Sequence, residues 1–377
     1  MSVYLDHAAT TPMVSASLDA MNASLKKLGN PSSLHTEGRA ARKDVEDARE
    51  VIAKAIDCQP SEVIFTGSGT EADNAAIKGL YWKSGKKVIV ISAIEHAAVI
   101  DPAEWLEAHE GAEIVRIPVD KDGLIDLDFL RQLIAKRGSE IALISIMHSN
   151  NETGVIQPVG EVVKIAGDIF VHTDAAQSFT KVPLSYKELG VTAMTLSAHK
   201  VGGPLGIGAL ILRRAMEIPA LLHGGGQERE IRSGTLNAPS IVAFAAAVQA
   251  HHYDAKKIET LRKKFEEGIT KSVGDAYING MSASRLPGIV NVTFPGTQSD
   301  SLLLLMDSEK VSCSTGAACS AGVHRPSHVL LAMGHSDVSA QSSLRFSLGA
   351  TTTEADVDFA LSVLPKVIER GRAANKK

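Results

Sequence analysis

One lysine lies in a short polar cluster between two apolar runs of the chain. Lys200 follows Ser197 and His199 directly after the apolar run 191–196, and a glycine-rich segment leads on to a second apolar run at 209–212. A lysine amine at the end of a buried strand has a lowered pKa and is a nucleophile at neutral pH. Such an amine suits Schiff-base chemistry. The alternative is a solvated loop lysine, because lysines are rarely buried.

A segment of small residues at 67–74 predicts a site for an anion. It follows the short apolar run 63–66 and continues into a helical pattern. A strand that turns into a helix presents free backbone amides and the positive end of the helix dipole, so a phosphate could bind at Gly69 and Thr70. The segment lacks the Lys-Ser/Thr pair of a Walker loop and the third glycine of a dinucleotide fingerprint. Taken alone, it is equally well explained as a plain helix cap.

Further polar residues come just after other predicted strands. They are His96, Asn151, Asp174 and Gln177, and Lys200 has the same kind of position. Singly, a histidine or an aspartate there is commonly a core residue or a helix cap. Together they supply what pyridoxal 5'-phosphate requires, namely an amine for the aldehyde, a carboxylate for the pyridinium nitrogen, an aromatic plate over the ring and phosphate donors.

The predicted elements that carry these residues alternate between strands and helices. The strands are continuous Val/Ile runs, which is typical of a mostly parallel sheet covered on both faces. Ligands bind at the carboxyl ends of the strands in such sheets, so the polar residues should converge. We predict strands at 63–66, 87–92, 113–118, 141–147, 169–173, 191–196 and 209–212, and helices at 14–28, 36–56, 127–136 and 158–166.

The last third of the chain predicts a smaller α+β unit. The composition changes near 251–257, after a glycine-rich, charged loop at 223–235 and a helix at 239–252. We place the large domain at 16–254 and the small domain at 1–15 and 255–377. Within the small domain we predict strands at 286–294 and 344–347 and helices at 258–273, 299–306 and 354–370.

Cys319 lies among small residues, with glycine and alanine at 316–318 and 321–322. Little there holds the side chain rigid, so we expect a mobile, exposed thiol. Cys58 and Cys313 fit the other common role of cysteine, a small buried residue. Three cysteines without paired spacing argue against a disulfide framework and against a zinc site, so no metal is expected. They are consistent with a reducing, cytoplasmic compartment.

The charge balance argues against two classes of partner. The chain has 39 basic and 43 acidic side chains among its 377 residues. Nothing in that balance favours a nucleic acid or a membrane surface as the main partner. No apolar run approaches the roughly 20 residues that span a bilayer. We therefore expect a small substrate.

Motifs over nearly the whole chain resemble the cysteine desulfurases of the NifS/IscS group, within the fold-type I pyridoxal-phosphate enzymes. The resemblance implies a large domain with a mainly parallel, seven-stranded type of sheet between helices, plus the smaller α+β domain. The combination of motifs is specific, although no single motif is. The motifs are 5–12, 69–74, 95–96, 150–154, 174–177, 197–200, 232–235, 314–321 and 343–347.

The resemblance implies roles for the cofactor-binding residues. Lys200 would carry the cofactor, Asp174 would pair with its pyridine nitrogen, His96 would stack on its ring, and Gln177 would contact its phenolic oxygen. The phosphate would lie at Gly69 and be held by Thr70, Ser197 and His199, with Thr235 reaching in from the second subunit of a homodimer.

The resemblance also implies a reaction. Arg345 and Asn151 would bind the carboxylate of L-cysteine, His96 would exchange protons with its thiol, and Cys319 would take the sulfur as a persulfide while L-alanine leaves. In the cysteine loop this chain reads Ser-Thr-Gly-Ala-Ala-Cys-Ser, where better-known relatives read Ser-Ser-Gly-Ser-Ala-Cys-Thr. Iron–sulfur scaffolds, tRNA-thiolation enzymes and DNA sulfur modification all remain possible destinations of the sulfur.

Other functions fit parts of the pattern. A selenocysteine lyase or an aminotransferase would share the fold. Alanine formed without a keto-acid co-substrate separates a desulfurase from a transaminase, and activity on selenocysteine separates the lyase. A nucleotide-binding or scaffold protein without chemistry could also contain the strand-turn-helix at Gly67, but it would be colourless when purified.

Overall fold

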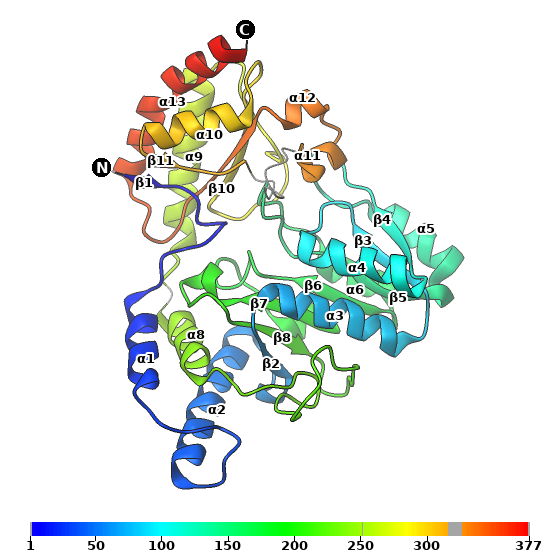
Figure 1. Cartoon of the computed structure of the whole chain (residues 1–377). Coiled ribbons are helices and arrows are strands. Elements are labelled where there is room, and N and C mark those ends of the chain that lie inside the picture. The colour runs from blue at the N-terminus through cyan, green and yellow to red at the C-terminus, as the bar shows by residue number, and fades with distance from the viewer. Residues whose placement is uncertain (1, 251, 316–325, 376–377) are drawn as a thin grey trace.

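The computed structural model describes residues 2–250, 252–315 and 326–375, and a seven-stranded sheet forms the centre of the larger part of this structure (Figure 1). The strand order across the sheet is β2-β8-β7-β6-β5-β3-β4. The strands are β2 (Val63–Thr66), β3 (Val88–Ser92), β4 (Glu113–Ile117), β5 (Ile141–Ser145), β6 (Phe170–Asp174), β7 (Ala193–Ser197) and β8 (Gly208–Leu212).

The pairing of these strands is mostly parallel. Strand β8 runs antiparallel to both of its neighbours, β2 and β7, whereas the other pairs in this sheet are parallel. The predicted fold class, a mostly parallel sheet between helices, is confirmed. The reversed direction of β8 was not predicted, because an apolar run of residues has the same pattern in either direction.

Both faces of the seven-stranded sheet are covered, because successive side chains of a strand point to opposite faces. In β2, Ile64 packs with α3 and α4, whereas Val63 and Phe65 pack on the other face. The helices of the first face are α3 (Gly69–Ser84) and α4 (Ala97–Glu110); the other face carries α2 (Thr36–Ile56), α5 (Leu127–Arg137), α6 (Val159–Ala166) and α8 (Ala238–Ala250).

The smaller part has its own apolar core (Figure 1). Its antiparallel sheet has the order β12-β10-β9, and helices α9, α10 and α13 pack against it. Phe265 meets Phe346 edge to face, with ring centroids 5.0 Å apart. The elements are α9 (Ala255–Ser272), β9 (Tyr277–Ile278), β10 (Ile289–Thr293), α10 (Ser299–Ser308), β12 (Ser343–Ser347) and α13 (Glu354–Asn375).

The N-terminus joins the two parts. Strand β1 (Val3–Tyr4) pairs in parallel with β11 (Val311–Ser312) of the smaller part, and helix α1 (Ser15–Leu25) then packs against α8 of the larger part. Each of the two sheets has its own apolar core, and the two cores are separate. The domain boundaries at 15/16 and 254/255 stay a prediction.

Several element boundaries differ from the predictions. The helix predicted to reach residue 28 ends at Leu25, and the strand predicted from residue 286 begins at Ile289. Pro287 explains the later start, because proline has no N–H for a strand ladder. The short strands β1, β9 and β11 and the helices α7 (Tyr186–Leu189), α11 (His328–Ala332) and α12 (Asp337–Ala340) were not predicted, since two to five residues carry too little periodicity.

A buried ion pair fixes the loop that follows β8. Arg49 of α2 donates to both carboxylate oxygens of Glu228, at 2.8 and 2.7 Å. Glu228 also accepts from the backbone N–H of Phe65 at 2.8 Å. Both side chains are buried, so neither charge has water as an alternative partner. The pair therefore ties the loop to the edge strand β2.

Replacing Arg49 with Met should lower the free energy of unfolding by about 3–5 kcal/mol, because Glu228 would remain as a buried, uncompensated charge. Urea denaturation followed by circular dichroism measures this loss. Lys43→Ala is the matched control from the same helix, since it removes an exposed pair with Asp47 and should leave the urea midpoint unchanged. Equal midpoints for Arg49→Met and the wild type would contradict this account.

Candidate active site

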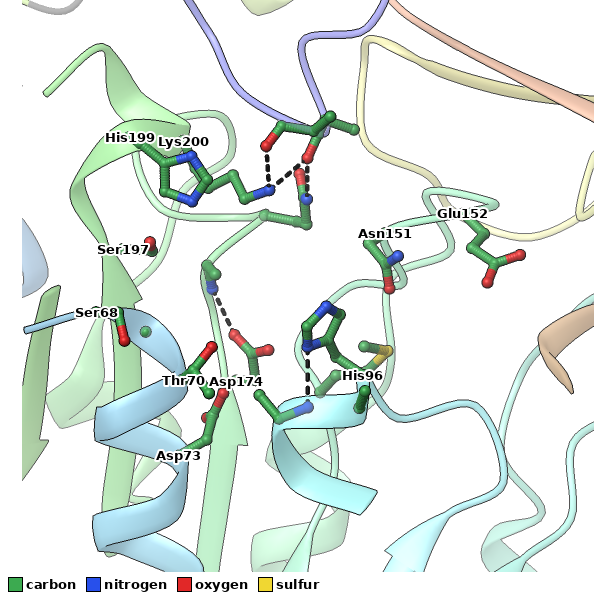
Figure 2. A pocket seen from close by; sticks show the side chains of 18 of the residues that line it. Ser68, Thr70, Asp73, His96, Asn151, Glu152, Asp174, Ser197, His199 and Lys200 are labelled. Atoms are coloured by element: carbon green, nitrogen blue, oxygen red, sulfur yellow. Dashed lines mark hydrogen bonds between the residues drawn. The ribbon is translucent and has the colours of Figure 1, made fainter. Parts of the chain in front are cut away.

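A cavity of about 740 Å³ lies at the carboxyl ends of the parallel strands (Figure 2). The convergence of polar residues expected from the strand ends is therefore present. The predicted residues that line the cavity are Gly69, Thr70, His96, Asn151, Asp174, Gln177, Ser197, His199, Lys200 and Arg345.

Two predicted site residues are not among those that line the cavity. Thr235 is exposed on the surface of its own chain, in the segment between β8 and α8. Cys319 lies outside the described residues. Of the other cysteines, Cys313 is buried as predicted, whereas Cys58 is only half-buried.

Lys200 presents its amine to the cavity from a single 3₁₀ turn, Ala198–Val201, directly after β7. Its Nζ donates to the backbone oxygens of Ala8 and Ala9, at 2.6 and 2.8 Å (Figure 2). Burial, and then the positive charge of Arg345, lower the pKa of Lys200 to about 8. A substantial fraction of the amine is therefore neutral near physiological pH, as a nucleophile requires.

Two buried carboxyl groups face each other across the floor of the site. Asp174 ends β6 and accepts from the backbone N–H of Ala176 at 2.8 Å. Asp73 of α3 lies beside it (Figure 2), and its Oδ1 has no hydrogen-bond partner among the described residues. Burial raises the pKa of both carboxyls, and the charge of Asp174 raises that of Asp73 further. A cationic N–H group placed here would be stabilised.

The start of α3 lies where the sequence predicts an anion site. Ser68 caps the helix by accepting from the backbone N–H of Glu71 at 3.0 Å. Gly69 and Thr70 follow, and both line the cavity. A Cβ on Gly69 would lie 3.2 Å from the Cβ of Ser197, so a larger residue here would have to push Ser197 away by a few tenths of an ångström. Backbone amides, hydroxyls and the positive helix end thus share one corner of the cavity.

His96 stands at the start of α4 with its ring on the side of the cavity opposite Thr70 (Figure 2). Its Nδ1 accepts from the backbone N–H of Ala98 at 3.1 Å, so a neutral ring carries its proton on Nε2. Desolvation lowers the pKa of His96, although the ring is exposed to the open cavity. The imidazole is therefore fixed in one tautomer that can donate or stack.

Gln177 has its amide orientation fixed by a second lysine. Its Nε2 donates to the oxygen of Ala8 at 2.9 Å, and its Oε1 accepts from Lys181 Nζ at 3.2 Å. A lysine can only donate, so the amide oxygen must face Lys181 and the NH₂ group must face away from it. Burial, and then the charges of Lys200 and Arg345, lower the pKa of Lys181 to about 7.

Arg345 and Asn151 meet at the boundary between the two parts of the structure. Arg345 belongs to β12 and is 4% exposed, and its Nη1 donates to the backbone oxygen of Asn151 at 3.0 Å. The turn that carries Asn151 is held by Asn150, whose side-chain oxygen accepts from the N–H groups of Glu152 and Thr153. A guanidinium and an amide therefore face the cavity from opposite chain segments.

No role was predicted for Asp73, Glu152, Lys181 or Asp6. The motifs 5–12, 69–74 and 150–154 contain Asp6, Asp73 and Glu152 and were a usable signal for them. Lys181 carries no such signal, because it lies in a turn outside these motifs and meets the site only after folding.

Residues 2–250, 252–315 and 326–375 contain neither a cluster of metal ligands nor a membrane-spanning helix. No group of three or more His, Cys, Asp or Glu side chains in these ranges could hold a metal ion. In the same ranges, every helix is too short or too polar to cross a bilayer.

A lysine, a buried carboxyl group and a helix-start anion site at the edge of this sheet define a pyridoxal-phosphate enzyme of fold type I. The aminotransferase class-V family matches residues 3–359. An IscS-like cysteine desulfurase of Mycobacterium tuberculosis is 46% identical to this chain, over 98% of this chain and 97% of its own. The chain belongs to the aminotransferase class-V family and, within it, to the IscS/NifS-like cysteine desulfurases.

Solved structures agree with this relationship. A structure described as a NifS-like protein has a TM-score of 0.90 at 35% identity, covering 98% of this chain and 100% of its own. A second, described as SspA in complex with cysteine, has a TM-score of 0.83 at 34% identity, covering 93% of this chain and 100% of its own.

The residues present fit pyridoxal 5'-phosphate, the cofactor of this family. Asp73 and Asp174 are two buried carboxyl groups side by side, which suits a site built around a pyridinium nitrogen. The α3 start suits the phosphate, and the amine of Lys200 suits the aldehyde.

The rate at which cofactor-free protein takes up pyridoxal phosphate covalently should rise with pH, with a midpoint near 8. The neutral amine is the nucleophile, and the pKa of Lys200 is about 8 rather than the usual 10.5. Stopped-flow absorbance of the visible band measures this rate, with Lys200→Ala as the variant that forms no covalent band. A rate that keeps rising to pH 10.5 would show an unperturbed lysine.

Proposed function

We propose that this chain is a cysteine desulfurase that converts L-cysteine to L-alanine and transfers the sulfur to Cys319 as a persulfide. The observation that supports it most is the half-buried Lys200 amine, with its lowered pKa, in one cavity with Asp174 and the α3 start. The SspA structure described with cysteine supports the choice of substrate.

Lys200, Asp174 and Gln177 would hold the cofactor, with the phosphate at Gly69 and Thr70. Bound pyridoxal phosphate supplies an electron sink that stabilises negative charge on the substrate Cα. Asp174 keeps the ring nitrogen protonated, which such a sink requires. Lys200, once its amine is free and neutral, takes the Cα proton.

Ser197 and His199 would complete the phosphate site. Both line the cavity, and His199 Nδ1 lies 3.2 Å from the hydroxyl of Thr10. Burial, and then the charge of Lys200, lower the pKa of His199 to about 4, so the ring is neutral and binds the phosphate through a hydrogen bond.

Arg345 and Asn151 would bind the substrate carboxylate, because a guanidinium forms charge-assisted pairs with carboxylates. His96, whose neutral ring carries its proton on Nε2, would donate that N–H to the substrate sulfur. This arrangement leaves the substrate sulfur free for attack from the side of the smaller part, where Arg345 lies.

The sulfur transfer would be a displacement at sulfur. The thiolate of Cys319 forms an S–S bond with the substrate sulfur while the Cβ–S bond breaks, and the electron pair of that bond stays with the substrate carbon. Protonation of the carbon gives L-alanine, so the sum is cysteine plus enzyme thiol to alanine plus enzyme persulfide. No further oxidant is needed.

A sulfur-acceptor protein would then remove the outer sulfur. An iron–sulfur scaffold or a tRNA-thiolation enzyme is the class of acceptor we propose, in the cytoplasm. The small cysteine content fits a reducing compartment.

Purified protein given L-cysteine and dithiothreitol should release alanine and sulfide in equal amounts without a keto acid. Cys319→Ala should keep the yellow colour of the bound cofactor but form no persulfide, because the attacking thiolate is lost. Mass spectrometry of the intact chain measures the persulfide. Cys313→Ala is the matched control, because Cys313 is buried and burial raises its thiol pKa to about 12. Full desulfurase activity in Cys319→Ala would refute the role of Cys319.

A homodimer is the assembly we propose, with Thr235 completing the phosphate site of the partner subunit. Support comes from the position of Thr235, which is exposed and does not line the cavity of its own chain. Sedimentation velocity should give twice the mass of the chain. In a dimer, Thr235→Ala should weaken cofactor retention several-fold during dialysis. A monomeric mass with full cofactor retention would refute this assembly.

A further inference from the structure

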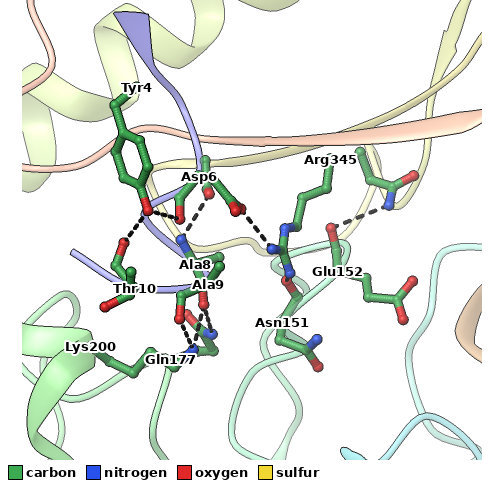
Figure 3. A network of polar contacts seen from close by, with 12 residues as sticks. Tyr4, Asp6, Ala8, Ala9, Thr10, Asn151, Glu152, Gln177, Lys200 and Arg345 are labelled. Atoms are coloured by element: carbon green, nitrogen blue, oxygen red, sulfur yellow. Dashed lines mark hydrogen bonds and ion pairs between the residues drawn. The ribbon is translucent and has the colours of Figure 1, made fainter. Parts of the chain in front are cut away.

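The N-terminal segment, residues 4–11, runs along the cavity between the two parts of the structure (Figure 3). It contacts several groups to which the proposed reaction gives a role. The backbone oxygens of Ala8 and Ala9 accept from Lys200, and that of Ala8 also accepts from Gln177. Asp6 differs from these residues, because it makes its contact through a charged side chain.

Asp6 forms an ion pair with Arg345. Its Oδ1 lies 2.8 Å from Nη2 of Arg345, while Nη1 donates to the backbone oxygen of Asn151 at 3.0 Å (Figure 3). The guanidinium is planar, so two contacts on different nitrogens fix its orientation. Nε is buried and has no hydrogen-bond partner among the described residues. The pair therefore leaves further N–H groups of Arg345 for another acceptor.

The backbone places the Asp6 carboxylate in register with Arg345. Asp6 forms a parallel bridge with Ser347, which lies two residues beyond Arg345 on β12. Ser347 N–H donates to the oxygen of Leu5 at 2.7 Å, and the hydroxyl of Tyr4 donates to the oxygen of Asp6 at 3.1 Å. The backbone of Asp6 is held on both sides by Ser347, because the N–H of His7 also donates to the oxygen of Ser347, at 3.2 Å.

The charges nearby explain why Arg345 needs this partner. Arg345 lies close enough to Lys200 and Lys181 to lower the pKa of both amines, so the region is strongly positive. A second carboxyl, Glu152, is buried nearby and accepts from the hydroxyl of Ser327 at 2.5 Å. Without Asp6, Arg345 would be a buried, unbalanced charge that is free to turn toward Glu152.

We propose that Asp6 is a positioning residue, which holds Arg345 in the orientation that receives the carboxylate of the amino-acid substrate. The inference rests on the proposed role of Arg345 in substrate binding. Because Asp6 fixes the guanidinium before the substrate arrives, the substrate need not supply the free energy of ordering it. Asp6 itself does not line the cavity.

The test is Asp6→Asn, which keeps the shape of the side chain and removes its charge. The KM for L-cysteine should rise about tenfold to a hundredfold, the usual effect of losing a hydrogen bond to a charged group. The kcat should change only a few-fold, because Asp6 acts on binding. Asp44→Asn is the matched control, since it makes the same change in an ion pair with Lys27 outside the cavity lining, and it should keep the wild-type KM.

Binding of two ligands separates positioning from general damage to the site. L-Alanine has the carboxylate, and cysteamine lacks it; both are titrated by the change in the visible band. Asp6→Asn should weaken L-alanine about as much as it raises KM and leave cysteamine unchanged. In an Arg345→Gln background, Asp6→Asn should have no further effect on L-alanine, because the group that it positions is gone.

Equal weakening of L-alanine and cysteamine, or an unchanged Kd for L-alanine, would overturn the proposal. Wild-type protein that forms no alanine from L-cysteine would overturn the proposed function instead. The L-alanine titration would still decide the role of Asp6 in that case, because it measures carboxylate binding and not desulfuration.

Discussion

Desolvation of a single amine is the constraint on which the rest of the site depends. Lys200 is useful to the proposed chemistry only if it can be neutral, and its pKa falls to about 8 because it is buried and lies near Arg345. The same burial would be costly without acceptors, which the backbone oxygens of Ala8 and Ala9 provide. A nucleophile, its acceptors and its cationic neighbour thus come from three distant parts of the chain.

Two carboxyl groups lie together on the floor of the cavity. Asp174 and Asp73 are buried there, and burial raises the pKa of both. Anion-binding backbone amides lie at one side, at the start of α3, so a pyridinium nitrogen beside the carboxyl groups and a phosphate at the helix start would each be stabilised. These two groups would orient the cofactor, with its nitrogen toward the carboxyls and its phosphate toward α3.

The main sheet and most of the cavity lining could be predicted because their signals are local. Strands such as β3 and β5 are unbroken apolar runs, and the polar residues that follow them meet at one edge by the geometry of parallel sheets. The direction of β8 could not be predicted, since no residue pattern encodes it. Asp6 and Arg345 are 339 positions apart, and Lys181 meets Gln177 only through a turn, so neither contact has a signature in spacing.

The pairing of β1 with β11, and of Asp6 with Ser347, has a consequence for the order of events during synthesis. Residues 3–6 find their partners only when residues 311–312 and 343–347 have been made. Until then, the wall that faces the reactive lysine is missing, although the strands that carry that lysine are complete. The catalytic pocket therefore closes late, and a nascent chain that lacks residues 343–347 cannot yet form it.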